Sequence, residues 1–443
     1  MKKTIIIGSN HAGIAAANVL LEYSDTHDVV IIEKNAEFSY LGCGTALWVG
    51  QQIESYEGLF YLNESEFRKK GATIYTNTEV TKVDFYNKTV TCSDDNHQIF
   101  TEHYDNLVLA TGSKPIILNV PGKELGNIHC LKTFNDGKIV NELAEKETIQ
   151  RVAVIGAGYI GVEIAEALQR RGKKVLLFDG ENRSLSSYYD QAFSQKMDDT
   201  LAKNGIELHF GERVTEYQGN KQIEHLVTDK GHYAVDMVIN AVGFLPNNEL
   251  GKNQLELFHN GAYIVDECQQ TSNPSVYAVG DCATIYSNAL QKTDYIALAT
   301  NAIRSGMVAG YNIAGRDVSS LGVQGSNAIS IFGFNMSSTG LSIESAKKKG
   351  LNVSYTEFED LQKPAFMADN YHVKLRIVYD TNSRRIVGAQ MCSEKDVSML
   401  IHLFSLSIHK KLTIDELQLL DLFFLPHFNQ PYNYITMAAL NAK

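Results

Sequence analysis

The sequence predicts an α/β fold with two Rossmann-like dinucleotide-binding domains, followed by a C-terminal α+β domain. Three observations predict this arrangement. Residues 4–33 read as a strand, a glycine-containing loop, a helix and a second strand that ends at an acidic residue. The same order recurs at residues 151–179. From residue 319 onward, the chain instead mixes strand-like segments with a helical one.

The first of these units has an incomplete glycine loop. A strand at Thr4–Ile7 and a helical pattern at Gly13–Glu22 precede a strand at Val29–Ile32, which Glu33 closes. The loop contains, in order, Gly8, Ser9, Asn10, His11, Ala12 and Gly13. Asn10 therefore stands where the fingerprint G-x-G-x-x-G has its middle glycine. The flanking strands and the terminal acid still predict a dinucleotide site here.

The second unit carries the complete fingerprint. A strand at Arg151–Ile155 precedes the loop, a helix at Val162–Arg170 follows it, and a strand at Val175–Phe178 ends at Asp179. The loop contains, in order, Gly156, Ala157, Gly158, Tyr159, Ile160 and Gly161. A loop of this kind between a strand and a helix predicts a second dinucleotide site.

Each residue of that fingerprint has a physical role. Gly156 permits a tight turn, Gly158 lets a pyrophosphate approach the backbone, and Gly161 lets the helix pack closely on the strand. The N-terminus of the helix then faces the anion. Asp179 can accept hydrogen bonds from an adenosine ribose and would repel a 2′-phosphate, so the site favours NADH over NADPH.

The remaining segments complete the expected fold. Alternating patterns at Ala72–Thr76 and Thr89–Cys92 indicate antiparallel strands between the two units. Further strands are expected at Val276–Gly280, Val373–Tyr379 and Ile386–Met391, and further helices at Ala297–Asn312 and Val397–His409.

Composition argues against several kinds of partner. The chain has 40 Lys and Arg residues against 51 Asp and Glu residues, a net charge of −11, and no basic run. We therefore expect neither nucleic acid nor a membrane as a partner. No apolar stretch approaches the roughly 18 residues of a membrane span, and the N-terminal apolar run is too short for a signal peptide, which predicts a cytoplasmic protein. The six cysteines are scattered without a C-x-x-C pair, so no metal site is expected.

Two further strand ends resemble those of a known family. One strand ends in Ala110-Thr111-Gly112-Ser113, and another ends in Gly280-Asp281. Together with the two glycine loops, these segments resemble the pyridine nucleotide–disulfide reductase superfamily over nearly the whole chain. The resemblance implies FAD in the first unit and NAD in the second. It also implies a discontinuous FAD-binding domain at 1–115 and 245–318, a NAD-binding domain at 116–244, and a dimerisation domain at 319–443.

The resemblance assigns residues to both nucleotides. It implies contacts with FAD by Gly8, Ser9, Asn10, Gly13, Glu33, Val80, Ala110, Thr111, Gly112, Ser113, Lys132, Tyr159, Asp281, Leu298, Ala299 and Thr300. It implies contacts with NAD by Gly156, Gly158, Ile160, Gly161, Asp179, Tyr188 and Gly243. Tyr159 resembles the tyrosine that covers the nicotinamide side of the flavin until NADH displaces it, and Glu163 follows on the same helix.

Cys43 stands alone where relatives that reduce disulfides carry two cysteines. Trp48 occupies the place of the second one, so Cys43 is expected to cycle through a sulfenic acid or a mixed disulfide. This pattern resembles the single-cysteine branch of the superfamily, in which Cys43 matches the redox cysteine and His11 the active-site histidine. We expect the nearby helix N-terminus and His11 to stabilise the Cys43 thiolate.

Within this branch the resemblance to water-forming NADH oxidases is strongest, on the basis of the segment Gly44–Gly50. It implies that O2 is reduced by four electrons to water and that the Cys43 thiolate becomes a sulfenic acid, which a second NADH reduces. Alternatives are an NADH peroxidase that uses H2O2, a coenzyme A–disulfide reductase and a redox sensor. Phe423–Pro431 resembles the segment that reaches the active site of the partner subunit, which implies a homodimer with Pro426 and His427 near that site.

Overall fold

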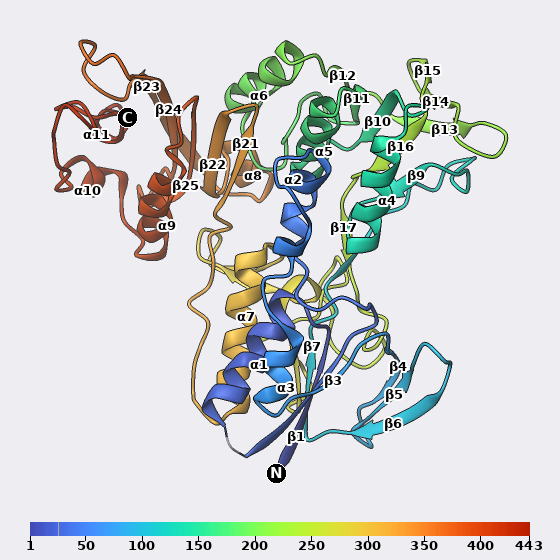
Figure 1. Cartoon of the computed structure of the whole chain (residues 1–443). Coiled ribbons are helices and arrows are strands. Elements are labelled where there is room, and N and C mark those ends of the chain that lie inside the picture. Colours follow the sequence, from blue (N-terminus) through green and yellow to red (C-terminus); the bar gives the residue numbers. More distant parts are fainter. Residues whose placement is uncertain (25) are drawn as a thin grey trace.

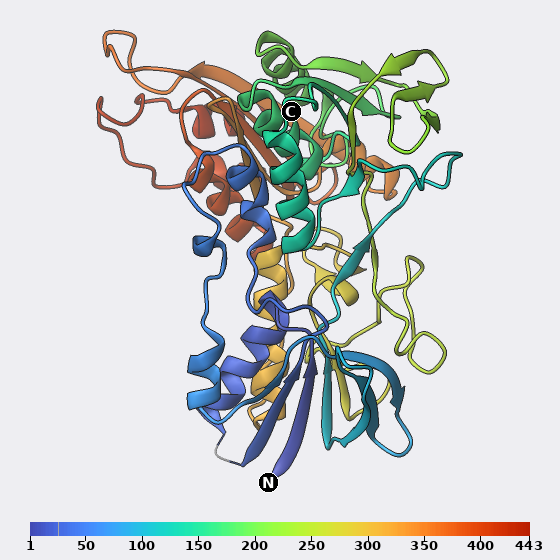
Figure 2. The ribbon, with the colours of Figure 1, turned by 45° about the vertical axis from the view of Figure 1, so that its right-hand side comes forward.

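The N-terminal unit is built on a parallel five-stranded sheet in the order β18-β7-β1-β2-β3. It lies at the bottom of Figures 1 and 2 in a computed structural model that describes residues 1–24 and 26–443. Its strands are β1 (Lys2–Ile7), β2 (His27–Ile32), β3 (Thr73–Tyr75), β7 (Asn106–Leu109) and β18 (Val276–Ala278). Helices α1 (His11–Tyr23) and α7 (Ala299–Ile313) lie side by side. They approach so closely that a Cβ at Gly306 would lie 2.1 Å from the carbonyl oxygen of Ala12.

The middle unit repeats this architecture with a second parallel sheet in the order β12-β11-β10-β16-β9. Its strands are β9 (Ile128–Cys130), β10 (Arg151–Ile155), β11 (Lys174–Asp179), β12 (Glu207–Phe210) and β16 (Met237–Asn240). Its helices are α4 (Phe134–Glu145), α5 (Tyr159–Arg170) and α6 (Gln191–Lys203).

The chain enters and leaves the middle unit through a two-stranded antiparallel pair, β8 (Ser113–Pro115) and β17 (Phe244–Pro246). Smaller antiparallel sheets extend the two units. They consist of β4 (Glu79–Asp84), β5 (Thr89–Ser93) and β6 (Ile99–His103); of β13 (Val214–Gln218), β14 (His225–Thr228) and β15 (His232–Ala234); and of β19 (Ile285–Ser287) and β20 (Lys292–Asp294).

The C-terminal unit is an antiparallel sheet in the order β21-β22-β25-β24-β23, which lies beside the middle unit at the top of Figures 1 and 2. Its strands are β21 (Asn327–Ile331), β22 (Phe334–Gly340), β23 (Val353–Leu361), β24 (His372–Asp380) and β25 (Ile386–Ser393). Its helices are α8 (Ile343–Lys348), α9 (Ile401–His409), α10 (Ile414–Gln418) and α11 (Tyr434–Leu440).

The structure confirms most of the predicted elements and corrects some. The strand at Arg151–Ile155 is found with the bounds we expected. The segment around Ala72–Thr76 is not antiparallel, because β3 pairs with β2 in parallel and closes one edge of the first sheet. Residue alternation reports which faces are buried and says nothing about the direction of the neighbouring strand. Val397–His409 is not one helix either, since a 3-10 turn at Ser398–Leu400 precedes α9.

Two short helices, α2 (Thr45–Val49) and α3 (Glu64–Lys69), complete the N-terminal unit. Helix α2 reaches away from that unit and packs against α4 and α5 of the middle unit (Figure 1). The redox segment around Cys43 therefore lies where the two units meet. Across residues 1–24 and 26–443, no helix combines the length and apolar character needed to cross a membrane.

Candidate active site

The two glycine loops have nearly the same geometry. Gly8 has a φ of +109° and Gly156 a φ of +100°, and a Cβ on either would lie 2.3 Å from a backbone carbonyl oxygen of the neighbouring strand segment. The middle positions differ in sequence but both are extended, since Asn10 has a φ of −106° and Gly158 a φ of −75°. Asn10 therefore replaces the middle glycine without backbone strain, and its side chain accepts a hydrogen bond from the His11 backbone N–H.

The loops fit the nucleotides that the sequence predicts. A Cβ at Gly158 would meet no heavy atom within 4 Å, so the chain leaves open space at the N-terminus of α5 for a pyrophosphate. Helix α7 begins at Ala299 without a side-chain cap, which leaves its first backbone N–H groups available. Gly243, another predicted contact, has a φ of +112° in the connection that follows β16.

The acids at the strand ends brace these loops, a role that the sequence did not reveal. Glu33 is buried and accepts hydrogen bonds from the Ser9 backbone N–H at 2.8 Å and the Ser9 hydroxyl at 3.1 Å. Asp179 accepts hydrogen bonds from the backbone N–H of Ala157 at 2.6 Å and of Glu181 at 2.8 Å. Each carboxylate thus holds its glycine loop, and binding of a ribose by Glu33 and Asp179 stays a prediction.

Three predicted FAD residues from distant parts of the chain meet in one cluster. The Lys132 ammonium lies 2.9 Å from the Ser113 hydroxyl and 3.3 Å from the Asp281 carboxylate, and Ser113 donates to the same carboxylate oxygen at 2.8 Å. Asp281 follows Gly280, whose φ is +72°. A Cβ at Gly280 would lie 2.9 Å from the Cβ of Ala12, at the start of α1. The cluster is therefore set directly beside the first glycine loop.

Cys43 lies in a 3-10 turn at Gly42–Gly44, immediately before α2, and is exposed. Even so, the protein around the thiol removes enough water to raise the pKa of Cys43, and the charges of Glu163 and Asp281 raise it further, while Lys132 opposes them. Burial and the nearby carboxylates thus disfavour the thiolate in the chain alone. Stabilisation of the thiolate by a helix N-terminus stays a prediction.

His11 is held by a residue that the sequence did not single out. Its Nδ1 lies 2.8 Å from the Tyr61 hydroxyl, and the two rings stack with centroids 5.3 Å apart. Burial lowers the pKa of His11, which favours the neutral, hydrogen-bonding form of its imidazole. Stabilisation of the Cys43 thiolate by His11 stays a prediction. The charges of Asp281 and Lys132 affect the pKa of both His11 and Cys43, which places all four at one site.

Trp48, which stands at the position expected for a second cysteine, packs in an aromatic core. Its side chain is buried and stacks on Phe134 of α4, with ring centroids 5.6 Å apart and planes 10° apart. Tyr40, Tyr56 and Phe60 surround the pair. The position that a second cysteine takes in other members is thus part of an aromatic core between α2 and α4.

Helix α5 carries Glu163 and Tyr159, a predicted FAD contact, and Tyr188, a predicted NAD contact, packs against Tyr159. Burial, followed by the charge of Glu166, raises the pKa of Glu163 to about 7. The ring of Tyr159, in the first turn of α5, meets Tyr188 edge to face with centroids 4.6 Å apart. Glu163 affects the pKa of Cys43 and of Tyr159, so α5 connects the redox segment with the second glycine loop.

Glu163→Gln tests the raised pKa. Since the folded chain retains a proton that the unfolded chain releases above its usual pKa of 4.5, Glu163 destabilises the fold increasingly as pH rises from 4.5 to about 7. We expect the substitution to raise the melting temperature of the FAD-loaded protein at pH 8 and to have little effect at pH 4.5. Glu142→Gln, at an exposed position on α4, is the control. A gain in melting temperature that is the same at pH 4.5 and pH 8 would contradict a raised pKa of Glu163.

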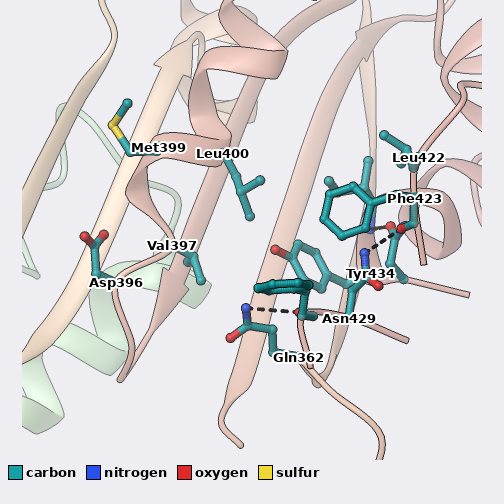
Figure 3. Close-up of a pocket in the computed structure, with 12 residues that line it drawn as sticks. Gln362, Asp396, Val397, Met399, Leu400, Leu422, Phe423, Asn429 and Tyr434 are labelled. Carbon is teal, nitrogen blue, oxygen red and sulfur yellow. Dashed lines mark hydrogen bonds between the residues drawn. The ribbon is translucent and has the colours of Figure 1, made fainter. Parts of the chain in front are cut away.

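The predicted dimer segment carries an exposed apolar surface. Phe423 is 68% exposed and Phe428 is 56% exposed, and they border a cavity of about 330 Å³ that is also lined by Leu400, Leu422 and Tyr434 (Figure 3). Asn429 donates a hydrogen bond to the Phe423 carbonyl at 2.7 Å and shapes the loop between them. Exposed aromatic side chains that cluster beside a cavity, as Phe423 and Phe428 do, are typical of interaction surfaces.

Two family models cover this chain. The pyridine nucleotide-disulphide oxidoreductase model matches residues 2–306, and the model of the dimerisation domain of that family matches residues 326–433. The chain belongs to the pyridine nucleotide-disulphide oxidoreductase family. This family depends on FAD and NAD(P)H, in agreement with the two nucleotide sites predicted from the sequence.

Several relatives that match the chain along its whole length are named NADH oxidases. A relative from Lactococcus lactis subsp. cremoris is 58% identical, and one from Streptococcus pyogenes is 49% identical, with full coverage of both chains in each case. Among solved structures, a water-forming NADH oxidase from Lactobacillus brevis bound to NADH is 35% identical. It aligns with a TM-score of 0.97 over 99% of this chain and 98% of its own.

Proposed function

We propose that this family member is an FAD-dependent NADH oxidase that reduces O2 by four electrons to water, with Cys43 alternating between thiolate and sulfenic acid. The observation that carries the proposal is the solitary Cys43 beside Lys132 and Asp281, with Trp48 buried where a second cysteine would sit. The relatives support NADH oxidase activity.

FAD, when bound, supplies the route by which electrons from NADH reach the oxidant. The Ser113–Lys132–Asp281 cluster and the loop at Gly8–Gly13 would hold FAD, and the loop at Gly156–Gly161 would hold NADH. One NADH and one proton reduce O2 to hydrogen peroxide. The Cys43 thiolate attacks one oxygen of this peroxide and breaks the O–O bond, which gives a sulfenic acid and hydroxide. A hydride equivalent from a second NADH and a proton from solvent then convert the sulfenic acid to thiol and water, and the hydroxide takes the thiol proton to restore the thiolate.

His11 and Tyr61 are suited to proton handling near Cys43. Burial raises the pKa of Tyr61 to about 12, so its hydroxyl stays protonated and can hydrogen-bond to His11 Nδ1. When Tyr61 donates this bond, the imidazole carries its proton on Nε2, which can donate a hydrogen bond to a reacting oxygen.

Tyr61→Phe keeps the ring stack and removes this hydrogen bond. We expect kcat to fall roughly three- to tenfold, because one neutral hydrogen bond contributes about 1 kcal/mol. Steady-state rates across pH, with Tyr56→Phe as a control in the aromatic core, provide the measurement. Unchanged rates would show that His11 does not depend on Tyr61.

The central test of the proposed function is the stoichiometry of the reaction. NADH and O2 consumption are followed together, with and without catalase. The proposal requires two NADH per O2, no free peroxide and no effect of catalase. Strict dependence on added H2O2 would instead identify a peroxidase.

A homodimer completes the proposal. The dimerisation-domain match and the apolar surface around Phe423 and Phe428 support it. In such a dimer, Pro426 and His427 are proposed to approach the site of the partner subunit. The cytoplasmic location remains a prediction from the sequence.

A further inference from the structure

A hydrogen-bond network joins the first turn of α5 to the C-terminal unit. The hydroxyls of Tyr159 and Tyr189 lie 2.9 Å apart, and the Tyr159 hydroxyl donates to Oδ1 of Asn327, the first residue of β21. The same Oδ1 accepts a hydrogen bond from the Ser338 hydroxyl at 3.0 Å. Tyr159, which the sequence places beside the nicotinamide, is therefore tied to a different domain.

Asn327 is itself held firmly. Its Nδ2 donates to the Gly325 carbonyl at 2.9 Å, and its backbone pairs with Ser338 in the β21–β22 ladder. These contacts fix the orientation of the amide, so its Oδ1 faces the two tyrosines as a stationary acceptor.

The segment 188–190 is clamped to the same domain. Tyr188 contacts the ring of Tyr159, and Asp190 is 1% exposed. The Asp190 carboxylate accepts a hydrogen bond from Gln390 at 2.9 Å and pairs with Arg376 at 3.2 Å, while its backbone N–H donates to Gln390 Oε1 at 3.0 Å. A buried, fully bonded pair of this kind is better suited to fixing position than to adding stability.

The position of the Tyr159 ring follows from these contacts. The ring packs against the apolar core that the middle unit shares with Ile329 of β21 and Met336 of β22. The Tyr159 hydroxyl would lose its partners, Tyr189 and Asn327, if the ring left this position.

We propose that Asn327 and Tyr189 form a latch that holds Tyr159 against this core and away from the space between α5 and the redox segment, so that the C-terminal unit controls how readily NADH reaches the flavin. The inference rests on the proposed function and on the family resemblance, which implies that Tyr159 lies beside the nicotinamide. Asn327 is a positioning residue that acts through Tyr159.

The test compares Asn327→Ala with the wild-type, FAD-loaded, full-length enzyme. We expect the KM for NADH to rise roughly fivefold and kcat to change less than twofold. Without the hydrogen bond, the Tyr159 ring more often occupies the space that NADH must enter, and saturating NADH displaces the ring again. Tyr159→Phe removes the same bond and should have the same effect, and the double variant should add nothing further. Asn335→Ala is the matched control. Asn335 Nδ2 makes the same local bond to a carbonyl two residues earlier, at 2.9 Å, and among the described residues its side chain bonds neither tyrosine.

Two readouts do not depend on turnover. NADH affinity in anaerobic titrations should weaken by the same factor as KM. Flavin fluorescence should fall in Asn327→Ala, because a tyrosine ring that stacks on flavin quenches it, and this decrease should vanish when Tyr159 is also replaced by alanine. Unchanged NADH affinity and fluorescence, or additive effects of Asn327→Ala and Tyr159→Phe, would overturn the latch. If the wild-type enzyme binds NADH but does not consume O2, the proposed function is contradicted. The NADH affinities of the wild type and Asn327→Ala would still test the latch.

Discussion

Cys43→Ser is expected to convert the enzyme from a producer of water into a producer of hydrogen peroxide while NADH oxidation continues. A serine hydroxyl is neither acidic nor polarisable enough to attack peroxide and form a stable sulfenic acid equivalent. Peroxide formed from O2 would then leave the site, and the NADH oxidised per O2 would fall by half. A peroxide assay beside an oxygen electrode measures both quantities.

Cys268→Ser provides the control for this substitution. Cys268 belongs to the N-terminal unit and lies in a turn where its backbone N–H donates to Asp266 at 2.9 Å, outside the site around Lys132 and Asp281. It should still yield water. A Cys43→Ser enzyme that produced only water would remove the sulfenic acid from the mechanism.

Gly156→Val should abolish NADH binding and leave FAD in place. Gly156 has a φ of +100°, and a Cβ there would lie 2.3 Å from the Ala241 carbonyl oxygen, so the loop between β10 and α5 must deform. The substitution raises the free energy of the folded loop in two ways. A β-branched residue in a left-handed conformation costs at least about 1–2 kcal/mol, and displacement of the Ala241 backbone costs more than that. The first sheet is a separate structure, so flavin content should be retained.

Gly172→Val separates these two costs. Gly172 also has a positive φ, +74°, but a Cβ there would meet no heavy atom within 4 Å. The control therefore carries only the conformational cost and should melt slightly earlier while NADH binds normally. Titration of both variants with NADH, with flavin absorbance recorded, gives the comparison. Equal NADH binding by the two variants would show that the loop is not a nucleotide site.

The two nucleotide-binding units could be predicted because their signals are local. A strand, a glycine turn and a helix follow one another within about thirty residues, and burial on both faces of a parallel strand leaves a continuous apolar run such as Val152–Ile155. The site residues around Lys132 were accessible only through resemblance to a family. Nothing in the spacing of Ser113, Lys132 and Asp281 indicates that they meet.

Residues whose partners lie far along the chain escaped prediction for a related reason. Tyr61 and Asn327 carry no motif, and each takes its role from a partner that lies far along the chain, His11 and Tyr159 respectively. The groups that raise the pKa of Cys43 were not predicted either. A helix N-terminus is visible in a sequence, whereas the loss of water and the approach of Glu163 depend on how the units pack.

The strand pair β8–β17 brings both chain connections of the middle unit to one point. Pro115 is paired with Phe244, and the Ile116 N–H donates to the Gly243 carbonyl at 2.9 Å, so the chain leaves and re-enters the first unit at one point. A short turn could join these ends without disturbing the first sheet. The middle unit is therefore one continuous stretch of sequence, which can be exchanged for another nucleotide-binding unit between the same two connections.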